Sequence, residues 1–298
     1  MKNRLLLRAK ILKKIRRFFN RRKVIEVETP LLLPTTNPAP YLDSFYCDGS
    51  YLQTSPEFAM KRLLASGSGD IYQICKAFRK NEEGRLHNPE FTLLEWYRIN
   101  FDHRDLMAEV DDLLQYTINT PKAKRYTYRE IFLKLLRINP HISTPKQLKS
   151  LAKKNNLRVS KLDNDKDIWL QLLFTHLIEP HLGTQEPTFI YDYPASQAML
   201  AKVRWTKYNL ASRFEVYYKG IELANGFHEL HDSQEQNERF KSDLLKRKKL
   251  KLPLVPIDDN FLVALTKLPN CSGVALGIDR LLLLATNAQS LDEVLCLR

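Results

Sequence analysis

Residues 78–97 constrain the fold of this chain more than any other part of the sequence. Their polar centre, 80–89, contains a glycine and a proline, and it separates two runs that are rich in branched and aromatic residues, 71–79 and 90–98. Such runs on either side of a turn are typical of two paired strands. The sequence therefore predicts a long β-hairpin with a charged tip.

The hairpin carries side chains suited to a nucleotide and to a second, smaller ligand. Arg79 and His87 lie at its tip, and a guanidinium pairs bidentately with phosphate oxygens. The ring of Phe91 is suited to stack on a base. Glu95 and Tyr97 are two residues apart, so on a strand they share one face and can line one pocket. A solvated hairpin with surface ion pairs is the alternative interpretation.

Three stretches together resemble the class II aminoacyl-tRNA synthetases. Residues 78–97 are similar to motif 2 of that class, and the segment H-N-P-E-F-T-L-L-E-W-Y is close to the lysyl branch. Residues 273–280, G-V-A-L-G-I-D-R, resemble motif 3. Residues 220–230, G-I-E-L-A-N-G-F-H-E-L, resemble the segment that binds the amino acid and magnesium in lysyl enzymes. The resemblance implies an α+β catalytic domain, in which helices flank an antiparallel sheet, over 1–298.

The N-terminal segment predicts an amphipathic helix followed by a strand. Residues 4–22 place apolar side chains at helical spacing between basic ones, and 24–30 read as a strand that ends at a proline. The apolar run 5–7 is too short for a signal peptide, although a basic helix of this kind can also bind a membrane surface. This arrangement resembles motif 1, the dimer-forming element of the class, and implies a homodimer.

A helix is expected from Ser55 to about residue 65, with Ser55 as its cap and Pro56 in its first turn. Glu57 would favour the helix dipole there, which is a sufficient structural reason for an acidic residue. The lysyl family has x-P-E at this place. By resemblance, Glu57 meets the amino group of the substrate.

The middle of the chain predicts a helix over 103–116 and then a Lys-rich helical insertion over 120–186. Within the insertion, Thr144 and Pro145 mark a helix start, and 167–182 read as an amphipathic helix. The basic residues of the insertion form either a solvated face or a docking surface.

Two glutamates and an aromatic residue follow in the next strands. Glu215 and Glu222 lie on either side of a turn, so their carboxylates can converge on a hard cation. The resemblance identifies that cation as magnesium. Phe227 and Glu229 would share a strand face, and an aromatic wall with a carboxylate beyond it suits an aliphatic chain that ends in an ammonium group.

The resemblance assigns roles to individual positions. Arg79 and Arg280 are implied to be catalytic, since they stabilise charge on the phosphates. The positions implied to bind ATP are Arg79, Asn81, His87, Phe91, Glu222, Leu223, Gly277 and Arg280. Those implied to bind the amino acid are Ser55, Glu57, Glu95, Tyr97, Phe227, Glu229 and Ala275. Glu215 and Glu222 are the implied metal ligands.

Two positions depart from the lysyl pattern. Asn81 stands where the family has the glutamate that reads adenine, and Glu82 follows one place later. Ala275 stands where lysyl-tRNA synthetases usually have glycine, so its methyl group would intrude on a pocket fitted to α-lysine. We expect a substrate with a shifted amino group to prefer the altered space.

The net charge and the cysteines of the chain indicate only a broad class of partner and site. The net charge of +13 suggests an anionic partner, such as RNA, a nucleotide or an acidic protein. The four cysteines, which show no C-x-x-C spacing, are Cys47, Cys75, Cys271 and Cys296. They predict neither a zinc site nor a disulfide framework, and they fit reduced thiols in a cytoplasmic protein.

The chain has no room for the anticodon-binding domain that lysyl-tRNA synthetases carry before motif 1. It resembles a group of lysyl-type paralogues reduced to the catalytic domain, which use ATP and magnesium to attach (R)-β-lysine to a lysine of elongation factor P; tRNA is then not expected as a substrate. A minimal synthetase that acylates tRNA or another amine remains an alternative. An inactive or nucleic-acid-binding paralogue is a third, but it would not need Arg79, Arg280 and both metal carboxylates.

Overall fold

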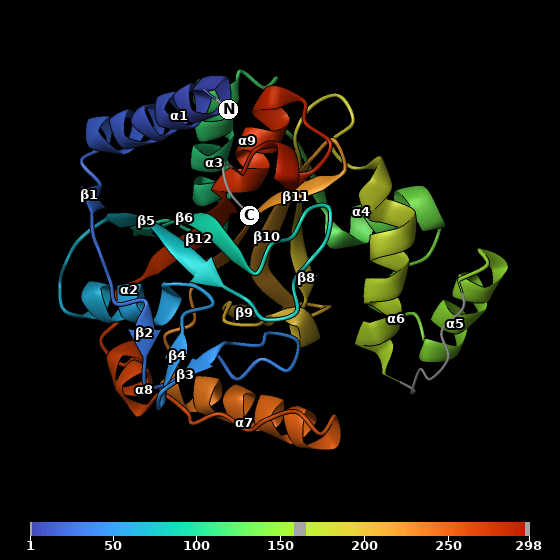
Figure 1. The fold of residues 1–298 in the computed structure, drawn as a ribbon. Helices are drawn as coiled ribbons and strands as arrows, with labels where there is room; N and C mark the ends of the chain where they lie inside the picture. The colour runs from blue at the N-terminus through green and yellow to red at the C-terminus, as the bar shows by residue number, and fades with distance from the viewer. Residues whose placement is uncertain (1, 158–164, 296–298) are drawn as a thin grey trace. The chain divides into compact units, whose positions relative to one another are not determined.

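The computed structural model describes residues 2–157 and 165–295, and the chain divides into two compact units (Figure 1). The first unit comprises Met1–Asn119 and His228–Arg298, and the second comprises Thr120–Phe227. Both units contain antiparallel strands with helices packed against them. The expected α+β class, an antiparallel sheet flanked by helices, is confirmed.

The first unit contains the predicted hairpin. Strand β5 (Ile71–Phe78) pairs antiparallel with β6 (Glu90–Ile99), and β6 pairs antiparallel with β12 (Cys271–Gly277). In this register Glu95 lies between Gln73 on β5 and Ala275 on β12. The chain's glutamate at the centre of motif 2 is therefore held by hydrogen-bonded strands on both sides.

Helix α1 (Lys2–Arg21) confirms the predicted amphipathic helix. It buries Ile11, Ile15, Phe18 and Phe19, and it packs with α3 (His103–Ile118) and α9 (Ile278–Thr286) (Figure 1). The strand predicted over 24–30 is much shorter, because only β1 (Ile25–Glu26) runs parallel to β5 before the chain leaves the sheet. Pro30, which has no N–H to donate, lies beyond that point.

A second group of helices in the first unit consists of α2 (Glu57–Ala65), α7 (Ser233–Lys249) and α8 (Asp259–Leu265), which pack against one another (Figure 1). The remaining elements of this unit are β2 (Leu32–Leu33), β3 (Tyr46–Cys47), β4 (Ser50–Leu52) and the 3-10 turn η4 (Leu291–Glu293). Strand β4 pairs antiparallel with both β2 and β3.

A basic run at the end of a helix, such as 246–249 of α7, is ordinarily exposed, but its arginine is buried. Arg247 is only 2% exposed. Its guanidinium donates to the carbonyls of Ala39, Leu42 and Pro253 and forms a 3.1 Å ion pair with Asp43. The five donors of a guanidinium can satisfy several carbonyls at once, which is why an arginine can be buried here.

The second unit is built on β8 (Thr188–Pro194), β10 (Leu210–Tyr218) and β11 (Ile221–His228), in which β10 pairs antiparallel with the other two. Its other strands are β7 (Lys124–Thr127), parallel to β8, and β9 (Val203–Arg204). Its helices are α4 (Tyr128–Leu136), α5 (Pro145–Lys154), α6 (Lys166–Leu173), the π-helix η1 (Phe174–Ile178) and the 3-10 turns η2 (Glu179–His181) and η3 (Ala195–Gln197).

The insertion over 120–186 is not purely helical, because β7 extends the sheet at its start. The helix start at Thr144 is confirmed, since its hydroxyl accepts from the amide of Gln147. The helix predicted over 167–182 is instead α6 followed by one π-helical and one 3-10 turn. Pro180 lies in the final turn, where it cannot donate a helical hydrogen bond.

None of the helices in the described ranges combines the length and the apolar character that a bilayer crossing requires. Cys47, Cys75 and Cys271 are free thiols. Cys296 lies outside the described residues.

Candidate active site

A cluster of buried carboxylates lies in the first unit around β6. The hydroxyl of Tyr97 donates to Glu95 Oε1 over 2.7 Å, and the hydroxyl of Ser55 donates to Glu95 Oε2 over 2.7 Å. Glu95 and Tyr97 are both buried. The shared strand face inferred from their spacing thus brings the two side chains into direct contact.

Ser55 does not cap α2 as expected. The helix begins at Glu57 with Pro56 in the cap position, which has no side-chain oxygen to offer. Ser55 lies one residue earlier, where its hydroxyl accepts from the amide of Glu57 over 3.1 Å while donating to Glu95. A single hydroxyl therefore connects the start of α2 to the carboxylate on β6.

Glu229 brings a third carboxylate to the cluster, and Lys61 joins it. Glu229 follows β11 directly, and its amide donates to the carbonyl of Cys271 on β12 over 3.0 Å. Lys61 Nζ lies 2.6 Å from Glu229 Oε2 and 2.7 Å from Glu57 Oε1. Lys61 was not among the predicted site residues, although its i,i+4 spacing from Glu57 on a helix indicates that the two side chains can pair.

The electrostatics of this cluster follow from its burial. Burial raises the pKa of Glu95 to about 7, with Glu57 adding to the rise and the donors Tyr97 and Ser55 opposing it. Burial likewise raises the pKa of Glu229 to about 8, against the attraction of Lys61. Burial alone would lower the pKa of Lys61, but Glu229 and Glu57 outweigh it and the pKa lies above its ordinary value. Burial therefore holds the pKa of both Glu95 and Glu229 above the ordinary range of a carboxyl group.

Strand β12 closes the cluster with two small residues. A Cβ atom added at Gly273 would lie 2.2 Å from Tyr97 Cε1 and 2.6 Å from Glu229 Oε1, so only glycine fits there. Ala275 lies directly opposite Glu95 in the β6–β12 ladder. Opposite residues of an antiparallel pair share a face, so the methyl group of Ala275 lies beside the Glu95 side chain.

The predicted phosphate-binding residues also lie in the first unit. Arg280 lies in the first turn of α9, as expected, and its guanidinium contacts His87 Nε2 at 2.8 Å and the carbonyl of Leu86 at 3.3 Å. Burial and the nearby Arg280 lower the pKa of His87. A neutral His87 can accept a hydrogen bond from Arg280, which connects the motif 2 loop to α9.

Arg79 lies at the base of the same loop. Its Nε donates to the carbonyl of Thr54 over 3.3 Å, and its guanidinium lies 5.1 Å from the ring centroid of Phe91. Asn81 adopts a left-handed backbone conformation with φ 66°, which asparagine tolerates better than most residues, and its amide lies 3.5 Å from Asp43. Glu82 lies 3.6 Å from Arg79. The contact of Asn81 with adenine stays a prediction.

The buried Asp279, which was not among the predicted site residues, positions α9. Asp279 Oδ2 accepts from the amide of Thr92 on β6, and Oδ1 pairs with Arg8 of α1, each over 2.7 Å. Gly277, an expected nucleotide contact, stands immediately before α9 as its cap residue. One carboxylate thus fixes the helix that carries Arg280 against both β6 and α1.

The other predicted residues, Glu215, Glu222, Leu223 and Phe227, lie in the second unit. Strands β10 and β11 are joined through Lys219 and Gly220, both with positive φ, so the turn inferred from the sequence is present. A β-bulge leaves Leu223 without a partner, and Glu222 therefore pairs with Tyr217. The bulge places Glu222 on the same face as Glu215.

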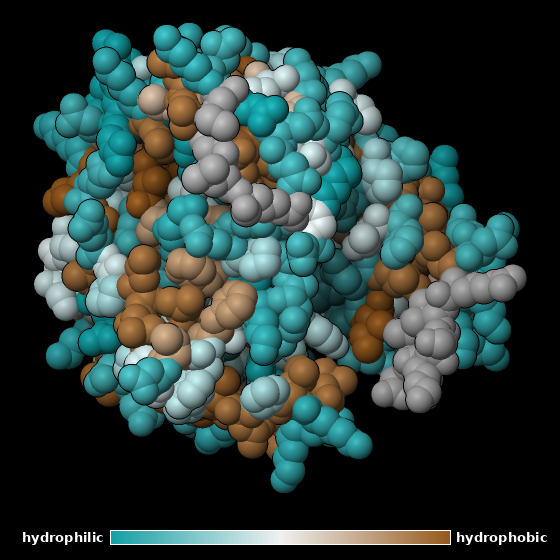
Figure 2. All heavy atoms as spheres, viewed as in Figure 1, coloured by the Kyte–Doolittle hydropathy of each residue, from teal (hydrophilic) through white to brown (hydrophobic). Residues whose placement is uncertain are grey.

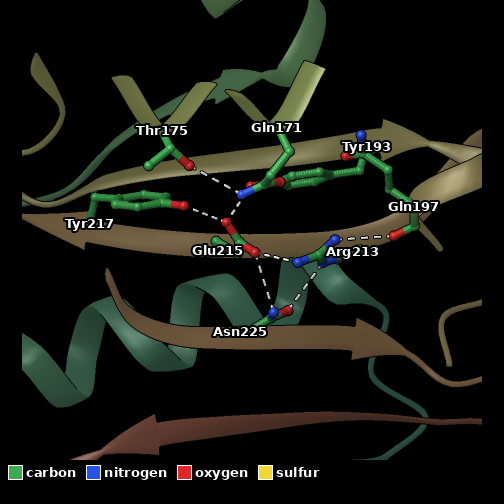
Figure 3. Close-up of polar contacts among 8 residues, drawn as sticks. All are labelled: Gln171, Thr175, Tyr193, Gln197, Arg213, Glu215, Tyr217 and Asn225. Carbon is green, nitrogen blue, oxygen red and sulfur yellow. Dashed lines mark hydrogen bonds and ion pairs between the residues drawn. The ribbon is translucent and has the colours of Figure 1, made fainter. Parts of the chain in front are cut away.

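Figure 3 shows Glu215 among the polar side chains that donate hydrogen bonds to it. Arg213 and Asn225 donate to Oε1, while Tyr193 and Tyr217 donate to Oε2. Arg213 also donates to the carbonyl of Gln197 over 3.1 Å. The alternation of Arg213, Glu215 and Tyr217 on β10 is a period-two pattern that was visible in the sequence.

Glu215 and Glu222 suit magnesium in ligand type, because both offer the oxygen ligands that a hard cation prefers. Each oxygen of Glu215 already accepts two donors, so a bound cation would replace at least one of them. No group of three or more His, Cys, Asp or Glu side chains arranged to hold a metal occurs within residues 2–157 and 165–295.

A family model described as class II tRNA synthetases (D, K and N) matches residues 1–297. This chain therefore belongs to the class II tRNA synthetase family. Among its relatives, the elongation factor P–(R)-β-lysine ligase of Salmonella typhi is 50% identical over 303 residues, which cover 98% of this chain and 93% of that protein.

Proposed function

We propose that this protein is a ligase that activates (R)-β-lysine with ATP and transfers it to the ε-amino group of a lysine on elongation factor P. The buried carboxylate cluster of Glu57, Glu95 and Glu229 carries this proposal, since it suits a substrate with two ammonium groups. The relative from Salmonella typhi, which covers nearly the whole chain, supports the particular substrate and acceptor.

The amino acid would bind through its charged ends. Glu57 and Glu95 would hold the ammonium group near the carboxylate, while Tyr97 and Glu229 would hold the ε-ammonium, with Phe227 beside the aliphatic chain. In (R)-β-lysine the first ammonium is one carbon farther from the carboxylate than in α-lysine. The Ala275 methyl group beside Glu95 supports selection of this isomer, because it occupies space at the end where the two isomers differ.

Activation would follow from positioning and charge stabilisation. The substrate carboxylate attacks the α-phosphorus of ATP, pyrophosphate leaves, and an aminoacyl-adenylate forms. Arg79 and Arg280 would stabilise the phosphate charge, while His87 keeps Arg280 in place. Phe91, beneath the Arg79 guanidinium, is suited to stack on adenine.

Transfer requires the acceptor lysine in its neutral form. Its ε-nitrogen attacks the acyl carbon, the bond between that carbon and the phosphate oxygen breaks, and AMP leaves with the electron pair; an amide forms as the nitrogen loses a proton to water. In the earlier activation step, magnesium bound with the help of Glu215 and Glu222 would supply positive charge that offsets the charge of the ATP triphosphate.

The acceptor and the oligomeric state belong to the same proposal. A net charge of +13 supports recruitment of an acidic protein by electrostatic steering, and it also favours the second candidate, acylation of tRNA or another amine.

A homodimer is supported by the exposed apolar side chains Leu5, Leu6, Ile25, Leu31 and Leu32. Figure 2 shows apolar side chains gathered over the region of α2 and β2. Action on a translation factor supports a cytoplasmic location.

ATP–pyrophosphate exchange tests the activation step directly. (R)-β-lysine should support the fastest exchange and α-lysine slower exchange, whereas norleucine, which lacks the ε-ammonium, should support none. Absence of exchange with every lysine isomer would refute the proposed activity.

A further inference from the structure

The buried Lys61 has no role in the synthetase motifs described above or in the proposed activation step. It lies on α2 one turn after Glu57 and is only 1% exposed. Its ammonium group bridges Glu57 and Glu229 at 2.7 and 2.6 Å and lies 5.8 Å from the ring centroid of Phe261. A lysine is rarely buried to this extent unless it is paired.

Stability alone does not account for this arrangement. A buried ion pair is often no more stabilising than apolar residues of similar volume, because both ions lose their hydration. Glu229 also remains incompletely satisfied, since its Oε1 is buried and accepts no hydrogen bond from any residue that the structure describes. A buried acceptor without a donor is unfavourable, so the cluster is incomplete until a donor arrives.

The charges of the cluster indicate what that donor should be. Three carboxylates, Glu57, Glu95 and Glu229, face one ammonium, that of Lys61, so the fully ionised cluster keeps two excess negative charges. An amino acid with two ammonium groups would neutralise this excess. A substrate with one ammonium group would leave one excess negative charge, which only a proton could balance.

We propose that Lys61 is a positioning residue that fixes the charge of the amino-acid pocket, so that the pocket selects a substrate with two ammonium groups. This inference rests on the proposed function and deepens it. Lys61 holds Glu57 and Glu229 together and neutralises one of the three carboxylates. It remains in place when the substrate ammonium groups pair with the rest.

The pocket without substrate balances its excess charge with protons. Burial raises the pKa of Glu95 and of Glu229 into the neutral range. Protons on these groups would be released when the substrate's ammonium groups replace them. The titratable groups that face this cluster from α2, β6, β12 and the end of β11 are Glu57, Lys61, Glu95, Tyr97, Cys271 and Glu229.

Substitution of Lys61 with chemical rescue tests the proposal. Lys61→Met and Lys61→Ala should lower kcat/KM for lysine in the exchange assay by about 100-fold, because truncating one partner of a buried charge pair leaves the other unpaired. Propylamine replaces the deleted carbons and ammonium group, so it should restore activity to Lys61→Ala. Propan-1-ol has a similar size but no charge, and it should not.

Arg62→Met is the matched control, because it removes one positive charge from the neighbouring, exposed position of the same helix. It should leave kcat/KM within about threefold, as expected of exposed positions. Retention of wild-type kcat/KM by Lys61→Met, or equal rescue by propanol and propylamine, would show that Lys61 only fills space and would overturn the proposal.

A measurement without substrate separates this inference from the proposed function. If the wild-type protein activates no lysine isomer, the proposed function fails, but the pH dependence of unfolding still reports on Lys61. A raised carboxyl pKa in the folded state favours folding at low pH, and this contribution is lost as pH rises through that pKa. Between pH 5 and 9 the unfolding temperature of Lys61→Met should therefore fall more steeply than that of wild type or Arg62→Met. Parallel curves would overturn the inference.

If neither Lys61 variant folds, calorimetric titration of the wild-type protein with lysine in two buffers of different ionisation enthalpy decides the question. The proposal predicts net proton release on binding at pH 7. No net release would contradict it.

Discussion

Substitution of Gly273 by alanine should damage the amino-acid pocket without removing a charged group. The added Cβ would lie 2.2 and 2.5 Å from Tyr97 Cε1 and Cδ1, and 2.6 Å from Glu229 Oε1. The Tyr97 ring is buried, and its hydroxyl is held by Glu95, so the ring can yield only by breaking that hydrogen bond. The methyl group must therefore displace Tyr97, Glu229 or β12 itself.

Overpacking of a well-packed interior by one methyl group typically destabilises a protein by about 1–3 kcal/mol. At about 2–4 °C per kcal/mol for a chain of this size, Gly273→Ala should lower the unfolding temperature by roughly 2–12 °C. Displacement of Tyr97 and Glu229 should also raise KM for lysine, because both would contact the ε-ammonium, and leave KM for ATP nearly unchanged.

Calorimetry and pyrophosphate exchange measure these two effects. Gly84→Ala is the control, since a Cβ there meets nothing within 4 Å and Gly84 does not have positive φ. If Gly273→Ala has the same unfolding temperature as Gly84→Ala and the wild-type KM for lysine, the tight packing of Gly273, Tyr97 and Glu229 is refuted.

Three further predictions concern substrate specificity, the pH dependence of stability and the buried Arg247. Ala275→Gly should move the preference toward α-lysine by freeing space beside Glu95, and unchanged selectivity in the exchange assay would count against that role. Because folding raises the pKa of Glu95 to about 7 and that of Glu229 to about 8, the contribution of these two carboxyls to stability should be fully present below about pH 4 and should be lost as pH rises to about 8; Glu229→Gln should flatten this part of the calorimetric profile. Arg247→Met should cost about 2–4 kcal/mol in denaturant unfolding, since it leaves buried carbonyls without donors, whereas the exposed Lys249→Met should change stability by less than about 0.5 kcal/mol.

Local sequence patterns predicted the parts of the fold that depend on local rules. Apolar runs and turn residues predicted the β5–β6 hairpin, and the period of a strand placed Glu95 and Tyr97 on one face. Helical spacing predicted α1, and the Thr144 cap predicted the start of α5. Each of these features is determined by residues close together in the chain.

The buried charges could not be predicted in this way. Lys61 and Arg247 lie in sequences typical of exposed helix faces, and their burial depends on Glu229 and Asp43, which are distant along the chain. Strand β7, K-R-Y-T, has a composition typical of a basic loop and exists because β8 pairs with it. The bulge at Leu223 that brings Glu222 onto the face of Glu215 likewise depends on strand register, which spacing alone does not reveal.

Mass spectrometry of the acceptor tests the central claim most directly. Elongation factor P and total tRNA would be incubated with the protein, ATP, magnesium and (R)-β-lysine, with α-lysine in a parallel reaction. We predict one β-lysyl adduct on a single lysine of elongation factor P and no acylated tRNA. Acylated tRNA together with unmodified elongation factor P would contradict the proposal and identify a minimal synthetase.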